Sequence, residues 1–178
     1  MALVLALPPT LTAWAQQPGS PDMVMQRDQV TESALIEALS LELPEKTRGF
    51  RPMTRPSVGI ASAPKGRANL LMTFATGSAE LNGETREMLD VVARALQSDT
   101  LATGIFTIEG HADQRGDPDA NRTLSQARAD AVIAYLVQHH SIARERLSAV
   151  GKGANEPLNR DRMDAPENRR VTIVTRRP

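Results

Sequence analysis

An aspartate and an arginine are spaced so that they could share one binding pocket. Asp113 follows a short segment predicted to be a strand, and Arg128 lies fifteen residues later in a segment with helical periodicity. The carboxyl end of a strand and the start of the next helix border the crevice where open α/β sheets usually hold ligands. A carboxylate and a guanidinium in one pocket suit a zwitterion, because each pairs with one half of it. Free backbone N–H groups at the helix start favour the same ligand carboxylate.

The same two residues could instead form an ion pair with a purely structural role. Many perturbed charge pairs in proteins are structural, and a surface pair contributes only about 0–1 kcal/mol to stability. The spacing of Asp113 and Arg128 does not distinguish a ligand-binding pair from a structural one, so both interpretations stay open at this point.

His111 precedes the aspartate by two residues and raises the question of a metal site. The other histidines, His139 and His140, are expected at the far end of a helix of about 16 residues, roughly 24 Å away at 1.5 Å per residue. A metal site built from histidines is therefore not expected. A structural histidine that forms hydrogen bonds is predicted instead.

The composition excludes several classes of site. The 178 residues include no cysteine, so disulfides, thiolate metal sites and a cysteine nucleophile are ruled out. Twenty-one basic residues balance 21 acidic ones, which argues against a nucleic-acid-binding protein, because such proteins need a surplus of Lys and Arg. Aromatic residues make up only 3% of the chain, so stacking platforms for bases or sugars are poorly supplied.

The sequence also lacks the common patterns of a catalytic site. Neither Ser78 nor Ser125 lies in a Gly-x-Ser-x-Gly motif, which argues against the nucleophile elbow of a hydrolase. There is no glycine-rich phosphate loop, and no pair of carboxylates lies in apolar surroundings that would raise one pKa for acid catalysis. A binding module is therefore predicted rather than an enzyme.

Short apolar segments and two amphipathic segments are expected to build the framework around the pocket. Strands are predicted over residues 69–74, 105–109, 147–150 and 171–174. One helix, capped by Thr85, is predicted through residues 89–96, and a second helix is predicted through residues 124–136. The order β-α-β-α-β-β predicts an α+β fold, a two-layer sandwich with the helices on one face of a small mixed sheet.

Three regions are expected along the chain. Residues 1–15 are uncharged and end in Ala13-Trp14-Ala15, the small-x-small pattern of a cleaved signal peptide, although no basic residue precedes the apolar stretch. Residues 16–66 hold six prolines, against four in residues 67–178, so they are predicted to be a linker. This linker is expected to contain one short helix, capped by Thr31, that either docks or frays. Residues 67–178 are predicted to fold as an independent domain.

Several short motifs follow one another in a fixed order. They are Phe74 with Ser78-Ala79-Glu80-Leu81, Gly110-His111-Ala112-Asp113, Asn121, Leu124-Ser125, Ala127-Arg128-Ala129, Gly151, Gly153, Pro157 and Asn168-Arg169-Arg170-Val171. This set resembles the OmpA-like peptidoglycan-binding domain, the C-terminal module of many outer-membrane and motor-anchoring proteins. The resemblance covers residues 69–174. Ala112 is a minor departure, because the family often has Thr at this position.

The resemblance implies a non-covalent link to the cell wall. In the family, the ligand is the free amino-acid end of diaminopimelate in the peptide stem of peptidoglycan. Asp113 and Arg128 fall on the two anchoring positions, and Asn121 falls on a supporting polar position. Arg169 or Arg170 is expected to line the edge of the site, and the sequence does not decide which of them faces inward. The implied location is the periplasm, in association with the cell wall and the outer membrane, and no cofactor or metal is implied.

Two alternatives to a wall anchor remain. A peptidoglycan hydrolase would need a nucleophile or zinc, and the sequence offers neither convincingly. An envelope scaffold would use the helix in the linker to recruit a partner protein. The oligomeric state stays open, because no heptad pattern is visible.

Overall fold

One five-stranded sheet organises the part of the chain that the computed structural model describes, residues 24–41 and 66–176. Its strands are β1 (Val24–Met25), β2 (Arg67–Leu70), β3 (Ile105–His111), β4 (Leu147–Gly153) and β5 (Val171–Arg176). They lie in the order β1-β2-β5-β3-β4, with parallel pairs β1–β2 and β3–β4 and antiparallel pairs β2–β5 and β3–β5. The predicted mixed sheet is confirmed.

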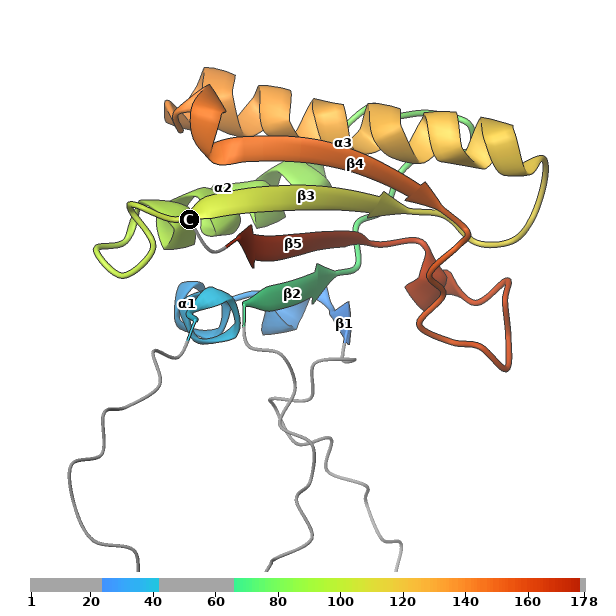
Figure 1. Ribbon diagram of the computed structural model, residues 1–178, viewed down its shortest axis with the longest axis horizontal. Coiled ribbons are helices and arrows are strands. Elements are labelled where there is room, and N and C mark those ends of the chain that lie inside the picture. Colours follow the sequence, from blue (N-terminus) through green and yellow to red (C-terminus); the bar gives the residue numbers. More distant parts are fainter. Residues whose placement is uncertain (1–23, 42–65, 177–178) are drawn as a thin grey trace, which may run out of the picture.

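Helices and short turns complete the described part of the chain. The helices are α1 (Glu32–Leu39), α2 (Gly83–Gln97) and α3 (Pro118–His140), and the 3-10 turns are η1 (Arg27–Gln29), η2 (Arg144–Arg146) and η3 (Pro166–Asn168). Figure 1 shows α3 running alongside β3 and β4, with α1 next to β2 at the other end of the sheet. Across the described ranges, no helix combines the length and apolar character that a membrane span requires.

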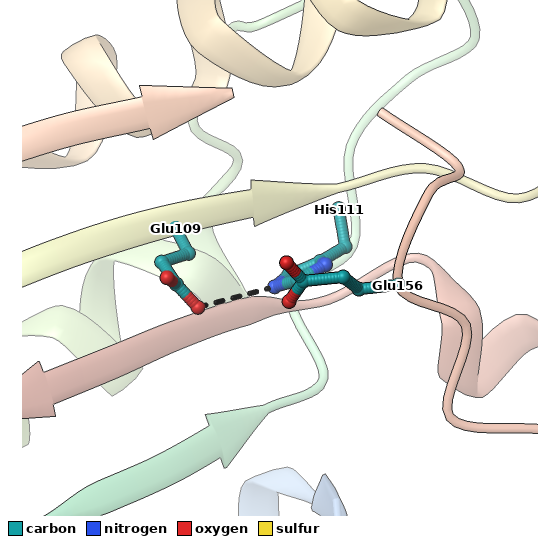
Figure 2. A group of neighbouring side chains, drawn as sticks. All are labelled: Glu109, His111 and Glu156. Atoms are coloured by element: carbon teal, nitrogen blue, oxygen red, sulfur yellow. Dashed lines mark ion pairs between the residues drawn. The ribbon is translucent and has the colours of Figure 1, made fainter. Parts of the chain in front are cut away.

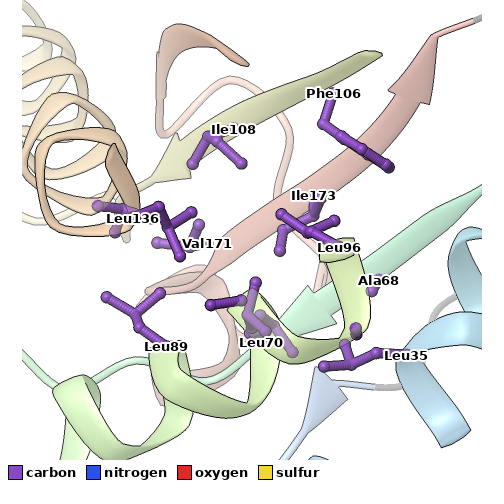
Figure 3. Packing of buried hydrophobic residues seen from close by; sticks show 14 of the residues in the cluster. Leu35, Ala68, Leu70, Leu89, Leu96, Phe106, Ile108, Leu136, Val171 and Ile173 are labelled. Carbon is purple, nitrogen blue, oxygen red and sulfur yellow. The ribbon is translucent and has the colours of Figure 1, made fainter. Parts of the chain in front are cut away.

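The sheet and the helices share one apolar core. Phe106 and Ile108 of β3 are buried in the same cluster as Leu89 and Leu96 of α2 and Leu136 of α3 (Figure 3). Because side chains alternate along a strand, the residues between the two buried positions of β3 face the other side of the sheet. The predicted two-layer α+β arrangement, with the helices on one face of the sheet, is therefore confirmed.

The segment between β2 and α2 departs from its prediction. The strand predicted over 69–74 ends at Leu70, and the carbonyl of Thr73 beyond it bonds to side chains rather than to a strand. The carbonyl of Thr73 accepts hydrogen bonds from Asn82 Nδ2 at 3.1 Å and from Thr85 Oγ1 at 3.0 Å. The cap of α2 is Asn82, whose side chain accepts the N–H of Thr85 at 2.8 Å. The predicted capping role of Thr85 is therefore wrong.

Helix α3 begins earlier than predicted. Its cap is Asp117, whose carboxylate accepts the N–H of Ala120 at 2.8 Å, and Pro118 occupies the first turn. Proline suits this position because the first N–H groups of a helix have no partner within the helix. The apolar periodicity starts only at Leu124, because the first turn of α3 faces solvent and carries polar residues.

The helix predicted within the linker is present as α1, and it docks on the sheet. Thr31 caps it as predicted, accepting the N–H of Ala34 at 3.2 Å. Leu35 and Leu39 are completely buried in the core. The apolar face of α1 is therefore covered by its own domain, which leaves it unable to recruit a partner without undocking.

The packed unit thus reaches further toward the N-terminus than residue 67. Strand β1 pairs with β2 through Val24–Asn69 and Met25–Leu70, and α1 adds its two leucines to the core. The placement of residues 24–41 in a linker is therefore wrong, because the leucine face of α1 gains free energy by leaving water. The signal peptide predicted at residues 1–15 lies outside the described residues, as do residues 16–23 and 42–65 of the predicted linker.

Candidate functional site

Three segments that are distant in the sequence meet beyond the carboxyl end of β3. They are the loop that joins β3 to α3, the segment that follows β2, and the segment that precedes β5. The residues that make contact there are Asp113, Arg115, Asn121, Arg128 and Arg169, which we call the loop cluster. Four of the five residues predicted for the site belong to this cluster.

Two glycines allow α3 to lie directly on the sheet. A Cβ atom on Gly110 would stand 2.1 Å from the carbonyl oxygen of Ser125, and one on Gly151 would stand 2.6 Å from the backbone nitrogen of Gln126. The N–H of Gly151 also donates to Gln126 Oε1 at 2.7 Å. This close contact fixes the helix one turn before Arg128 and so sets where its guanidinium lies.

The carboxylate of Asp113 is buried and surrounded by donors. Its Oδ2 accepts hydrogen bonds from Arg115 Nη2 at 2.7 Å, Arg115 Nε at 3.0 Å and Arg169 Nη1 at 2.7 Å, and its Oδ1 accepts the N–H of Arg115 at 3.1 Å. Burial alone would raise the pKa of Asp113, but these donors outweigh it and lower the pKa to about 2. Asp113 therefore stays ionised throughout the physiological pH range.

The side chain of Arg128 is held by backbone carbonyls and an aromatic ring. Its Nε donates to the carbonyl of Ser78 at 3.0 Å, its Nη2 donates to the carbonyl of Ala75 at 3.4 Å, and its guanidinium lies 4.7 Å from the ring centre of Phe74. Burial lowers the pKa of Arg128, the positive charge of Arg169 lowers it further, and Asp113 partly opposes both effects. Among the described residues, Nη1 has no hydrogen-bond partner.

Asn121 supports the loop that carries the aspartate. Its Nδ2 donates to the carbonyl of Arg115 at 2.8 Å and to that of Asp113 at 3.3 Å. These bonds tie the first turn of α3 to the loop before it. The side chain is thus placed to hold the loop in shape, in keeping with the supporting position that the sequence predicted.

The structure distinguishes the two neighbouring arginines. Arg169 turns toward Asp113, whereas Arg170 is buried beside β2, where its Nε lies 3.4 Å from Asn69 Oδ1 and its Nη2 donates to the carbonyl of Glu156 at 3.1 Å. Both line the same cleft. Of the two, Arg169 is the one that joins the loop cluster.

A cleft of about 150 Å³ opens beside the loop cluster. It is lined by Leu71, Met72, Thr73, Phe74, His111, Arg128, Pro166, Arg169 and Arg170. Guanidinium groups next to an aromatic ring and apolar side chains suit a ligand with a negative group on a short aliphatic chain.

Asp113 and Arg128 do not pair with each other. The carboxylate of Asp113 forms ion pairs with Arg115 and Arg169, and no carboxylate within the described ranges bonds to Arg128. The alternative of a structural ion pair between these two residues is therefore wrong. Both side chains are also buried, with 6% and 8% of their residue surfaces exposed, so substitutions here act on stability as well as on binding.

Sequence reasoning missed Arg115 as a member of the site. It stands two residues after Asp113 and supplies three of the hydrogen bonds to that carboxylate. An Asp followed two residues later by a donor is the pattern of a local side-chain-to-backbone turn, and this signal was available in the sequence.

A second group of charged residues lies at the same end of β3, on the sheet. It consists of Arg67, Glu109, His111, Lys152 and Glu156, which we call the sheet-face cluster. Within it, the ligand atoms of Glu109, His111 and Glu156 lie within 4.8 Å of one another (Figure 2). Burial alone would raise the pKa of Glu109. The neighbouring His111, Arg67 and Lys152 outweigh this effect, so the pKa of Glu109 is lowered.

The prediction that His111 forms hydrogen bonds is wrong. Both ring nitrogens are buried and have no hydrogen-bond partner among the described residues, and Nε2 lies 3.8 Å from Glu109 Oε2, beyond hydrogen-bond distance. The bulge between Gly110 and His111 shifts the register of β3 at this point. Burial lowers the pKa of His111, an effect that Glu109 only partly offsets.

Comparison with known proteins gives a consistent result. A model of the OmpA family matches residues 73–170. Outer-membrane lipoprotein YfiB of Pseudomonas aeruginosa is 34% identical over 105 residues, which cover 57% of this chain and 60% of that protein. Peptidoglycan-associated lipoprotein of the same organism is 34% identical over 108 residues, covering 60% of this chain and 62% of its own length. The chain thus spans less than two thirds of the length of these curated relatives.

Solved structures agree with this match. The peptidoglycan-associated lipoprotein from Burkholderia pseudomallei superposes with a TM-score of 0.51 and 27% identity, over 59% of this chain and 88% of that one. The cell wall anchor of the T6SS from Pseudomonas aeruginosa gives a TM-score of 0.50 and 29% identity, over 62% of this chain and 81% of that one. The residues matched by the family model, 73–170, contain the loop cluster and most of the residues that line the cleft.

Proposed function

Because the chain belongs to the OmpA family, we propose that it binds peptidoglycan non-covalently and anchors an outer-membrane or other envelope component to the cell wall. The observation that carries the proposal is the cleft lined by Arg128 and Arg169, beside which the buried carboxylate of Asp113 accepts a hydrogen bond from Arg169. Relatives named as peptidoglycan-associated lipoproteins and as a cell wall anchor support it. The role is binding, so it requires no nucleophile, metal or cofactor.

The finer proposal concerns the group that is recognised, the free amino-acid end of diaminopimelate in the peptide stem. Its carboxylate would approach Nη1 of Arg128, the only nitrogen of that guanidinium without a hydrogen-bond partner among the described residues. Its ammonium would take a place on Asp113. The side chain of Arg115 is 66% exposed, so it can move into solvent and leave Asp113 to the ligand, while Arg169 stays in place.

This exchange has a physical advantage. An ammonium that replaces an exposed guanidinium on Asp113 leaves the buried carboxylate paired, so no buried charge is left without a partner. The ligand carboxylate meanwhile meets an excess of positive charge, because three guanidinium groups surround a single carboxylate in the loop cluster. Both halves of a zwitterion thereby find a partner.

The proposed location follows from the ligand. Peptidoglycan lies outside the cytoplasmic membrane, so the domain must act in the periplasm, next to the cell wall and the outer membrane. Export would be directed by residues 1–15, with cleavage after Ala15. N-terminal sequencing of protein from the periplasmic fraction should then begin at Gln16.

Sedimentation with purified sacculi tests the proposal. Asp113→Asn and Arg128→Gln should each weaken binding by roughly 30-fold to several thousandfold, because each leaves one ligand charge unpaired at a cost of about 2–5 kcal/mol. Arg122→Gln is the matched control, since Arg122 is an exposed arginine on the same helix. Melting curves establish that each variant is folded before its binding is scored. Folded variants that bind like the wild type would overturn the proposed site.

A second comparison tests the diaminopimelate detail by itself. Sacculi whose third stem residue is lysine keep an ammonium for Asp113 but offer no carboxylate to Arg128. Binding to these walls should be weaker than binding to diaminopimelate walls. Equal binding would remove the zwitterion argument and leave the wall anchor in place, whereas no binding to either wall would reject the anchor.

A further inference from the structure

We propose that Glu109, His111 and Glu156 form a binding site for a divalent transition-metal ion of the Zn²⁺ type. Figure 2 shows the imidazole of His111 turned toward the two carboxylates, at the end of β3. The ligand atoms of the three residues lie within 4.8 Å of one another. This proposal is independent of peptidoglycan binding, although His111 also lines the cleft.

The histidine is the first argument. Its side chain is 1% exposed, and neither ring nitrogen has a hydrogen-bond partner among the described residues. Buried polar atoms without a partner are rare in proteins and costly, so each one calls for an explanation.

The donor set is the second argument. One imidazole nitrogen and two carboxylate oxygens are ligands that Zn²⁺ accepts, and three protein ligands leave a position for water. Bonds of about 2.0–2.2 Å in a tetrahedral arrangement place two ligand atoms about 3.3–3.6 Å apart, so a gap of up to 4.8 Å must close by about 1 Å. Glu156 is exposed on a loop, so rotation of its side chain can supply this movement.

Two cations compete for the same carboxylates. Lys152 Nζ lies 3.3 Å from Glu109 Oε1 and 2.8 Å from Glu156 Oε1, and Arg67 Nη2 lies 2.9 Å from Glu109 Oε2. A metal ion must displace the ammonium of Lys152. That residue lies on β4 at the edge of the sheet, with 27% of its side chain exposed, so its ammonium can move into solvent. Lys152 is thus expected to set the affinity.

Because of this competition, substitutions in the cluster should change the metal affinity in opposite directions. Calorimetric titration of the full chain with ZnCl₂ at pH 7 should give one ion per chain. His111→Asn and Glu156→Gln should weaken the affinity by roughly 10-fold or more, because each removes a ligand. Lys152→Met should strengthen it by roughly 10-fold, because it removes a competing positive charge.

Two controls distinguish this site from adventitious binding. His140→Asn should leave the affinity unchanged, because His140 lies next to Asp90, away from this cluster. MgCl₂ should not bind comparably, because Mg²⁺ prefers sites made only of oxygen ligands. Circular dichroism shows whether His111→Asn folds, and if it does not, Glu156→Gln and Lys152→Met decide the matter.

Three outcomes would overturn the proposal. The first is the absence of Zn²⁺ binding in both the wild type and Lys152→Met. The second is unchanged binding in folded Glu156→Gln or folded His111→Asn, which would place the ion elsewhere. The third is equal binding of Mg²⁺ and Zn²⁺, which would indicate surface carboxylates without the histidine.

Discussion

The loop cluster and the sheet-face cluster lie at the same end of β3, yet they balance their charges in different ways. In the loop cluster, the single carboxylate of Asp113 accepts bonds from Arg115 and Arg169, and Arg128 adds a further positive charge nearby. In the sheet-face cluster, two carboxylates face Arg67 and Lys152, so the charges cancel while His111 has no hydrogen-bond partner among the described residues.

The difference shows how the ratio of donors to acceptors determines what a cluster can bind. An excess of guanidinium groups around one satisfied carboxylate leaves positive charge for an anionic ligand. In the sheet-face cluster the charges balance, so there is no excess charge to attract a ligand. A ligand must therefore compete with Arg67 and Lys152 for the carboxylates and also bond to a ring nitrogen of His111. The two clusters should therefore respond differently to substitution, pH and added ions.

The largest effect is expected where one residue supports both clusters. Gly110→Ala would place a Cβ atom 2.1 Å from the carbonyl oxygen of Ser125, and neither backbone can easily move. We expect a loss of roughly 3 kcal/mol or more in unfolding free energy, measured by urea denaturation, because overpacking forces helix and sheet apart. Gly83→Ala, with nothing within 4 Å of the added Cβ atom, should change stability by less than about 0.5 kcal/mol. Equal midpoints for Gly110→Ala and wild type would contradict the close packing of α3.

A destabilising change remote from both clusters distinguishes stability from binding. Leu35 of α1 is completely buried, so Leu35→Ala should lower the unfolding free energy by about 2–4 kcal/mol through the lost apolar burial and the cavity left behind. Below its melting range the variant should still sediment with sacculi like the wild type. Glu37→Ala, at an exposed position of the same helix, is the control. A wild-type melting point for Leu35→Ala would show that α1 does not contribute to the core in solution.

Acid should act on the loop cluster through one carboxylate. The pKa of Asp113 is lowered from 3.8 to about 2 in the folded protein, so its contribution to stability is present above pH 4 and is lost as the pH falls toward 2. This contribution is about 2 kcal/mol. Asp113→Asn should be less stable by about that amount at pH 7, and its stability should fall less steeply between pH 4 and pH 2. Parallel pH profiles for variant and wild type would contradict the buried, donor-rich setting of Asp113.

The smallest effect is expected for the histidine of the sheet-face cluster. Replacing a buried polar group that lacks a partner by an apolar one of similar size is nearly neutral, so His111→Met should change stability at pH 7.5 by less than about 1 kcal/mol. Because burial lowers the pKa of His111, the unfolded state takes up a proton first, and the wild type loses stability as the pH falls below about 6.5. His111→Met should lack this loss between pH 7.5 and 5.5, as followed by thermal unfolding. A large loss of stability at pH 7.5 would indicate that His111 has a polar partner in solution.

The sequence by itself determined the architecture and much of the site. Alternating and helical apolar patterns located strands β3, β4 and β5 and the interiors of α2 and α3, because these patterns follow directly from which face of an element leaves water. The position of Asp113 after a strand and of Arg128 within the next helix predicted that both residues border one crevice. The motifs around them carry the resemblance to the OmpA family, to which the chain belongs.

Only the tertiary structure decided which charges meet. Arg169 reaches Asp113 from 56 positions further along the chain, and Glu156 lies beside His111 although the two are 45 positions apart in the sequence. The same holds for α1, whose docking depends on a surface formed by β2 and α2. The spacing of apolar residues predicts which face of a single helix or strand is buried. Contacts between distant segments depend instead on the register of the sheet and on the course of the loops. Local sequence therefore leaves the partners of a side chain undefined until the fold brings them together.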